Sequence, residues 1–355
     1  MASFSKCGFL LLAFLLQVLS CYPKVDSKLL VPAIYIFGDS TIDSGNNNQI
    51  MTLIRANFPP YGKDFPGGIA TGRFTNGKLV TDFLSSFVGL PDEVPANLDP
   101  QFTGEKLLTG ASFGSAGAGI DNSTSVPSGT ITLAQQYENF KSYRANLTDM
   151  VGEEESSKIV TEALFAISMG TNDFSENYYS NAVTRAKYDI EQFQSLLLQE
   201  LQSFIQNIYK EGATKFLVIG VPPFGCLPQQ ITMHNLINGS CISEYNEVAT
   251  SYNKKLSSLI EMMKPSLQGL QIVYIDVYDK LLDMIVNPNK YGFEEVRKGC
   301  CGTGLYEVGP LCNTFSKLCP NASTYVFWDS VHPTSATYNI LANDIFKQME
   351  RLIRW

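Results

Sequence analysis

A serine, a histidine and a carboxylate stand at positions where they could carry out nucleophilic chemistry. Ser40 follows the apolar run Ala33–Phe37, after only Gly38 and Asp39. Asp329 precedes His332 by three residues. On a tight loop, this spacing lets the carboxylate bind one ring nitrogen and leaves the other free to take a proton from a serine. Each pattern alone is also typical of a surface turn. Together they predict a serine nucleophile, a histidine base and an acid that orients the base.

Attack on an ester also needs hydrogen-bond donors for the oxyanion that develops on the carbonyl oxygen. Three donors are available: the backbone N–H of Ser40, a backbone N–H in the glycine-rich stretch 107–120, and the side-chain amide of Asn172. Asn172 lies in Gly170-Thr171-Asn172-Asp173, directly after an apolar run. The chain has one further histidine, His234, in a polar stretch without a neighbouring acid, which is typical of a surface histidine.

The elements that must position these residues alternate between strand and helix. Apolar runs predict strands at 33–37, 163–169, 215–219, 271–275 and 325–328, and a 3.6-residue apolar period predicts helices at 79–88, 190–210, 245–263 and from about 334. Such alternation predicts βαβ units and a mainly parallel sheet that is covered on both faces. We expect the loops that carry Ser40, Asn172 and His332 to meet at one edge of this sheet.

A second candidate nucleophile lies in the glycine-rich stretch. Gly110-Ala111-Ser112-Phe113-Gly114 matches G-x-S-x-G, the nucleophile elbow of α/β-hydrolases. That elbow follows a long apolar strand and opens a helix, whereas more glycines follow here. A further alternative is not an enzyme at all but a secreted cell-wall glycoprotein that binds its ligand without converting it.

The N-terminus and the cysteines favour secretion. Lys6 precedes an apolar run that is too short to span a bilayer, so residues 1–21 are expected to be a signal peptide and 22–355 a single domain. The cysteines beyond residue 21 predict disulfides of open connectivity rather than a zinc site. Four sequons predict N-glycosylation on exposed loops, at Asn122, Asn146, Asn238 and Asn321. The formal net charge of −8, without a basic patch, argues against nucleic acid as a partner.

Four blocks, in order along the chain, resemble those of the GDSL (SGNH) esterase/lipases, and most closely the large secreted plant members. They are Gly38-Asp39-Ser40, the glycine-rich stretch, Gly170-Thr171-Asn172-Asp173 and Asp329-Ser330-Val331-His332. Thr41, Ser112 and Gly114 depart from the residues usual in that family. The resemblance implies a flavodoxin-like three-layer α/β/α sandwich and acyl-ester chemistry without metal or cofactor.

The same resemblance implies a role for each matched residue. Ser40 corresponds to the nucleophile, His332 to the base and Asp329 to the residue that orients it. Gly117 and Asn172 correspond to the oxyanion donors, together with the Ser40 N–H. The implied partner is a small-molecule or polymeric acyl ester met outside the cell, in the apoplast or the cell wall, and both hydrolysis and acyl transfer remain open.

Overall fold

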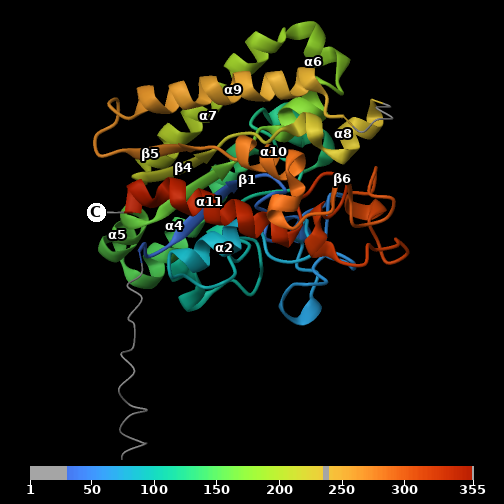
Figure 1. The fold of residues 1–355 in the computed structure, drawn as a ribbon. Helices are drawn as coiled ribbons and strands as arrows, with labels where there is room; N and C mark the ends of the chain where they lie inside the picture. Colours follow the sequence, from blue (N-terminus) through green and yellow to red (C-terminus); the bar gives the residue numbers. More distant parts are fainter. Residues whose placement is uncertain (1–29, 235–239, 354–355) are drawn as a thin grey trace, which may run out of the picture.

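The computed structural model describes residues 30–234 and 240–353, so residues 1–21 and the sequon at Asn238 lie outside the described residues (Figure 1). A five-stranded sheet forms the centre of the molecule, with all strands parallel and in the order β2-β1-β3-β4-β5. Its strands are β1 (Ile34–Gly38), β2 (Gly110–Ser112), β3 (Leu164–Ser168), β4 (Lys215–Ile219) and β5 (Gln271–Ile275). This is the flavodoxin-like strand order, which confirms the predicted fold class.

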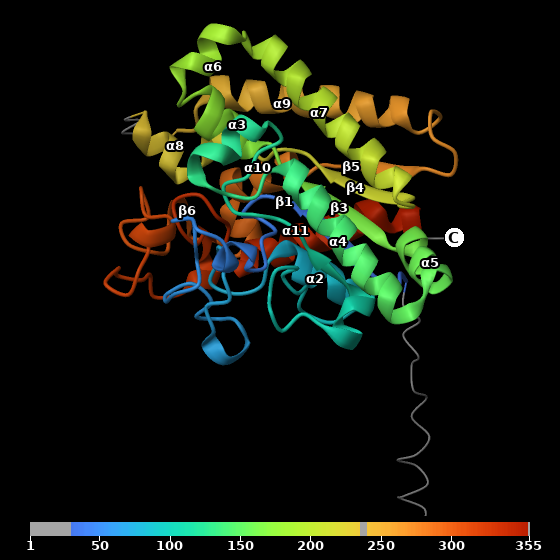
Figure 2. The same ribbon diagram turned by 180° about the vertical axis from the view of Figure 1, so that it is seen from behind.

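Helices cover both faces of the sheet. One face carries α2 (Val80–Phe87), α10 (Tyr278–Val286) and α11 (Ser335–Ile353), which lie in front of the strands in Figure 1. The opposite face carries α4 (Leu133–Val151), α7 (Ile190–Lys210) and α9 (Ser243–Met263), with α4 and α7 in front in Figure 2. Shorter helices lie in the connections: α3 (Asn122–Ser125), α5 (Glu153–Glu162), α6 (Ala182–Lys187) and α8 (Pro228–Met233).

The long helices form where the apolar period and the capping residues agree. In α7, Asp189 caps the N-terminus by accepting from the Gln192 N–H, and the Gln192 side chain accepts from the Asp189 N–H. The buried face of α7 contains most of the residues that its apolar period predicts, among them Phe193, Leu197 and Ile208, although Ile190 is only half-buried. No helix among residues 30–234 and 240–353 is long and apolar enough to cross a membrane.

Two expectations about the sheet need correction. Tyr325–Phe327 forms strand β7, but β7 does not belong to the central sheet and instead pairs in parallel with β6 (Glu295–Gly299). The glycine-rich stretch, for which no strand was expected, contributes the edge strand β2 beside β1. The backbones of β2 and β1 approach closely at Gly110, which only a glycine allows, because a Cβ atom there would lie 2.0 Å from the Ile34 carbonyl oxygen.

Six cysteines of the described chain form three disulfides: Cys226–Cys241, Cys300–Cys319 and Cys301–Cys312. The last two lie in the C-terminal loop region beside β6 and β7, where their sulfur atoms pack into a small second core with Tyr61, Phe74 and Trp328. In the part of the chain that the structure describes, no group of three or more His, Cys, Asp or Glu side chains is arranged to hold a metal ion.

The three described sequon asparagines, Asn122, Asn146 and Asn321, are all exposed. Asn122 begins the short helix α3 and Asn146 lies within helix α4, so the expected loop position is wrong for these two residues.

Candidate active site

Ser40 lies in the turn that follows β1, at the carboxyl edge of the sheet. The turn depends on Gly38, whose φ of 152° and tight packing exclude a side chain, because a Cβ atom there would lie 1.9 Å from the Ser168 carbonyl oxygen. Gln136 of α4 holds the same glycine, with its side chain bonded to both the N–H and the carbonyl of Gly38 at 2.9 Å. Ser40 is therefore carried on a closely fixed backbone.

Hydrogen bonds join Ser40, His332 and Asp329 into one chain. His332 Nε2 lies 2.7 Å from Ser40 Oγ, and His332 Nδ1 lies 2.8 Å from Asp329 Oδ2. Asp329 Oδ1 also accepts from the backbone N–H groups of Val331 and His332. Ser40 and His332 are 7% and 3% exposed and Asp329 is fully buried, so water has little access to the acid and the imidazole.

The amide of Asn172 and the loop that carries Gly117 are joined to each other. Asn172 Nδ2 donates to the Ala118 carbonyl at 2.9 Å, and Gly117 precedes Ala118 with a φ of 82°. Among the described residues, no hydrogen bond links Asn172 or Gly117 directly to Ser40. The structure thus places the two loops against each other.

Two buried carboxyl groups tie the loops of the site together. Asp43 accepts from the N–H groups of Asn46 and Ala116, which joins the loop after β1 to the glycine-rich stretch. Asp173 accepts from the N–H groups of Ile120 and Asp121, which joins that stretch to the loop after β3. Burial raises the pKa of Asp43 to about 6 and that of Asp173 to about 7.

The other serine and histidine that the sequence singles out lie elsewhere. Ser112 ends β2, is fully buried, and donates its hydroxyl to the Ile42 carbonyl at 2.7 Å. No helix begins directly after it, since the next helix, α3, begins at Asn122. His234 is exposed, as expected, and its ring nitrogens contact the Gln230 carbonyl and the Tyr245 hydroxyl.

An apolar cavity of about 80 Å³ lies beside Ser40, Asn172 and His332. Its other walls come from α2, α10, α11 and the end of β4, and include Val80, Ile219, Val221, Leu281, Leu341 and Ile345. A cavity with few polar groups around a serine and a histidine suits the acyl part of an ester better than a sugar or a charged group.

Sequence reasoning missed one polar side chain that contacts the site. The Tyr61 hydroxyl donates to Asp329 Oδ2 at 2.8 Å, and the residue is almost fully buried. It lies in the loop segment Pro59-Pro60-Tyr61-Gly62. A tyrosine in such a segment carries no periodic or spacing signal, so only the tertiary structure shows the contact.

Comparison with known proteins shows the family of the chain. The model of the GDSL-like Lipase/Acylhydrolase family matches residues 34–345. The chain belongs to this GDSL family. Its elements from β1 to most of α11 fall within the matched range.

Three similar relatives are Arabidopsis thaliana proteins named GDSL esterase/lipase. One is 44% identical over 90% of this chain and 89% of its own, and a second is 44% identical over 96% of both. A third is 46% identical over 87% of this chain and 84% of its own. Together with the family model, these relatives show that the GDSL chain is a carboxylic ester hydrolase.

Among solved structures, a Clostridium thermocellum family 3 carbohydrate esterase aligns with 91% of this GDSL chain and 98% of its own. The TM-score is 0.37 and the sequence identity is 14%, so this similarity is too distant to inform the site.

Proposed function

We propose that this protein is a secreted serine esterase/lipase in which Ser40 is the nucleophile, His332 the general base and Asp329 the residue that orients the base. The observation that carries the proposal is the hydrogen-bonded chain from Ser40 Oγ through the imidazole to the buried carboxylate. The apolar cavity beside Ser40 supports an apolar acyl group as the part of the substrate that is bound there.

In the proposed reaction, Ser40 Oγ attacks the ester carbonyl carbon while His332 Nε2 takes the hydroxyl proton. The Ser40 N–H, the Gly117 N–H and the Asn172 amide stabilise the oxyanion of the tetrahedral intermediate. His332 then gives its proton to the departing alcohol, which leaves the acyl group on Ser40. Water, or a second alcohol in a transfer reaction, attacks this acyl-enzyme and releases the acid or a new ester.

We also propose that residues 1–21 are removed as a signal peptide and that residues 22–355 form one domain outside the cell. Three disulfides among the described residues support an oxidising compartment. The proposed glycosylation at Asn122, Asn146 and Asn321 is supported by the exposure of each side chain. N-terminal sequencing of the secreted protein, and its gel shift after endoglycosidase treatment, test these points.

Two serine variants test the nucleophile. On a panel of esters with graded acyl length, Ser40→Ala should lose hydrolysis about a thousandfold or more, because the remaining groups supply no covalent path. Ser112→Ala is the matched control and should keep most of the activity, since its hydroxyl bonds only backbone groups, the Ile42 carbonyl and the Gly114 N–H. A labelled fluorophosphonate should react with the wild type and with Ser112→Ala but not with Ser40→Ala.

The reverse result, with Ser112→Ala inactive and Ser40→Ala active, would show an α/β-hydrolase-type nucleophile at Ser112. A wild-type protein that neither hydrolyses the panel nor reacts with the fluorophosphonate would instead be a binding glycoprotein.

A further inference from the structure

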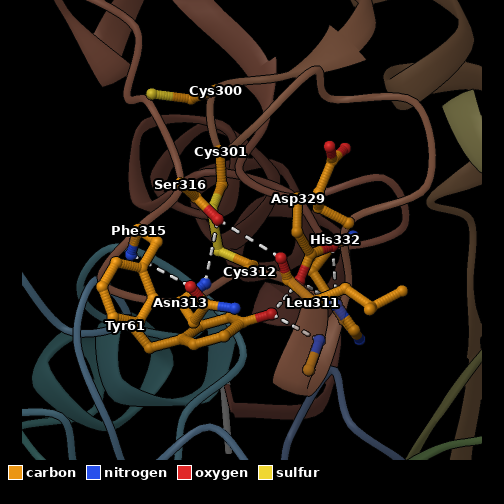
Figure 3. Close-up of a disulfide and its surroundings, with 12 residues drawn as sticks. Tyr61, Cys300, Cys301, Leu311, Cys312, Asn313, Phe315, Ser316, Asp329 and His332 are labelled. Atoms are coloured by element: carbon orange, nitrogen blue, oxygen red, sulfur yellow. Dashed lines mark hydrogen bonds and ion pairs between the residues drawn. A yellow bond between two sulfur atoms is a disulfide. The ribbon is translucent and has the colours of Figure 1, made fainter.

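Tyr61 connects the acid of the site to a disulfide-closed loop that lies far away in the sequence. Its hydroxyl donates to Asp329 Oδ2 at 2.8 Å and accepts from the Gly309 N–H at the same distance. Figure 3 shows the Tyr61 hydroxyl directed at Asp329, with the Cys301–Cys312 disulfide beside it. Gly309 lies inside the loop that this disulfide closes.

The Tyr61 ring is fixed by aromatic packing on several sides. Its centroid lies 5.8 Å from that of Phe58, 5.6 Å from that of Phe74 and 6.3 Å from that of Trp328. Phe74 also packs against the His332 ring at 4.9 Å. Because these contacts fix the ring, they also fix the direction from which the Tyr61 hydroxyl reaches Asp329.

The Tyr61 phenol stays protonated and can therefore donate a hydrogen bond. Burial and the neighbouring Asp329 carboxylate raise the pKa of Tyr61 well above its usual value, so the hydroxyl keeps its proton. The Gly309 N–H occupies a lone pair of the phenol oxygen, which leaves the phenol proton for the carboxylate. A charge-assisted bond of this kind is among the stronger hydrogen bonds in proteins.

Asp329 Oδ2 therefore receives Tyr61 O–H and His332 Nδ1 at the same time, while Oδ1 receives two backbone N–H groups. These bonds fix the plane of the carboxylate, and the carboxylate in turn fixes the imidazole that faces Ser40. We propose that Tyr61 is a positioning residue of the esterase, which sets the orientation and charge of Asp329 and is itself set by the loop closed by Cys301–Cys312. This inference rests on the proposed function of Ser40, Asp329 and His332.

Other titratable groups also surround the imidazole, and they bear on any pH measurement. Besides Asp329 and Ser40, these are Asp39, whose carboxylate interacts with His332, and Tyr338, which interacts with both aspartates. Among the residues that the structure describes, Tyr61 and His332 are the only side chains that form hydrogen bonds with the Asp329 carboxylate.

Tyr61→Phe removes one oxygen atom and keeps the ring, so the aromatic packing should persist. Without the phenol proton, the charge of Asp329 is less dispersed, and the carboxylate then stabilises the protonated imidazole more strongly. We expect kcat to fall about tenfold, KM to change little, and the acid limb of the kcat/KM profile to move to higher pH. Tyr35→Phe is the matched control, because Tyr35 is fully buried and loses a hydroxyl bond to Tyr143 away from the site.

A double-mutant cycle separates positioning from a loss of stability. In an Asp329→Ala background, Tyr61→Phe should have no further effect on kcat, whereas independent effects would multiply. An unmoved acid limb with kcat within twofold of wild type would overturn the inference, as would an equal loss in Tyr35→Phe or multiplicative effects in the cycle. If Ser40→Ala stays active, the proposed function fails instead, so the two failures are distinguishable.

Discussion

One proton of the Asn172 amide is already committed in the folded protein. Nδ2 donates to the Ala118 carbonyl at 2.9 Å, which fixes the plane of the amide, and an amide nitrogen carries a second proton. A donor that is held in place before the reaction stabilises a developing oxyanion without reorganisation. The bond to Ala118 therefore supports the proposed role of Asn172, because it aims the remaining N–H rather than consuming it.

Asn172→Ala should lower kcat by about 10²- to 10³-fold with little change in KM, since one oxyanion donor is lost. Asn177→Ala is a matched control on the same segment: its buried amide also bonds the loop around α3, through Ser123 and Thr124. The control should lose stability but not kcat. Steady-state kinetics with thermal unfolding of both variants makes the check, and equal kcat losses would reject the oxyanion role.

The site residues differ in how far the sequence reveals them. Asp329 and His332 are three residues apart, so their contact follows from local geometry and is present in the structure. Tyr61 and Asp329 are 268 residues apart, and their bond depends on how two loops pack. No periodicity or spacing encodes such a contact, which is why the tyrosine was not predicted.

At the scale of elements, sequence patterns identify strands better than their partners. The apolar runs of β1, β3, β4 and β5 predict buried strands, and all four pair in the central sheet. The run in β7 is just as apolar, yet β7 pairs with β6, whose charged sequence Glu295–Gly299 gives no strand signal. An apolar run reports burial and leaves open which neighbour supplies the hydrogen bonds.

A buried ion pair fastens α2 to the loop that follows Ser40. Arg73 makes two bonds of 2.8 Å to Asp82 of α2, and it also donates to the carbonyl groups of Ser44 and Val94. Asp82 in turn accepts from the Leu79 and Val94 N–H groups. Both side chains of the pair are nearly inaccessible to water. This pair joins the helix that lines the cavity to the segment that carries Ser44.

Arg73→Ala should lower the free energy of unfolding by about 3–5 kcal/mol, because it leaves the Asp82 carboxylate buried without its counter-ion. Lys290→Ala is the control, since the Lys290–Asp283 pair is exposed at the lysine, and the loss should be much smaller. Urea unfolding of both variants measures the difference. Losses of similar size in the two would contradict the structural role given to the Arg73 pair.

At the scale of the whole molecule, several buried carboxyl groups bind protons more tightly in the folded chain than in the unfolded one. Burial raises the pKa of Asp43 to about 6 and of Asp173 to about 7, from 3.8, and it also raises the pKa of Asp39. Groups of this kind stabilise the fold fully below their unfolded pKa, and this contribution is lost as the pH rises through the folded pKa.

The free energy of unfolding should therefore be larger at pH 5 than at pH 8, by an amount on the order of a few kcal/mol, because one unit of pKa difference corresponds to about 1.4 kcal/mol. The groups with lowered pKa values, Asp92, Asp283 and Glu307, lose their contribution only in more acidic solution, so they do not reverse the trend in this range.

The variant Asp173→Asn tests the cause, because its amide cannot ionise. It should flatten part of the pH dependence even though it lowers the free energy of unfolding overall. Urea unfolding of the wild type and this variant at both pH values makes the comparison. A wild-type stability that rises from pH 5 to pH 8 would show that the donors around Asp43 and Asp173 outweigh their burial.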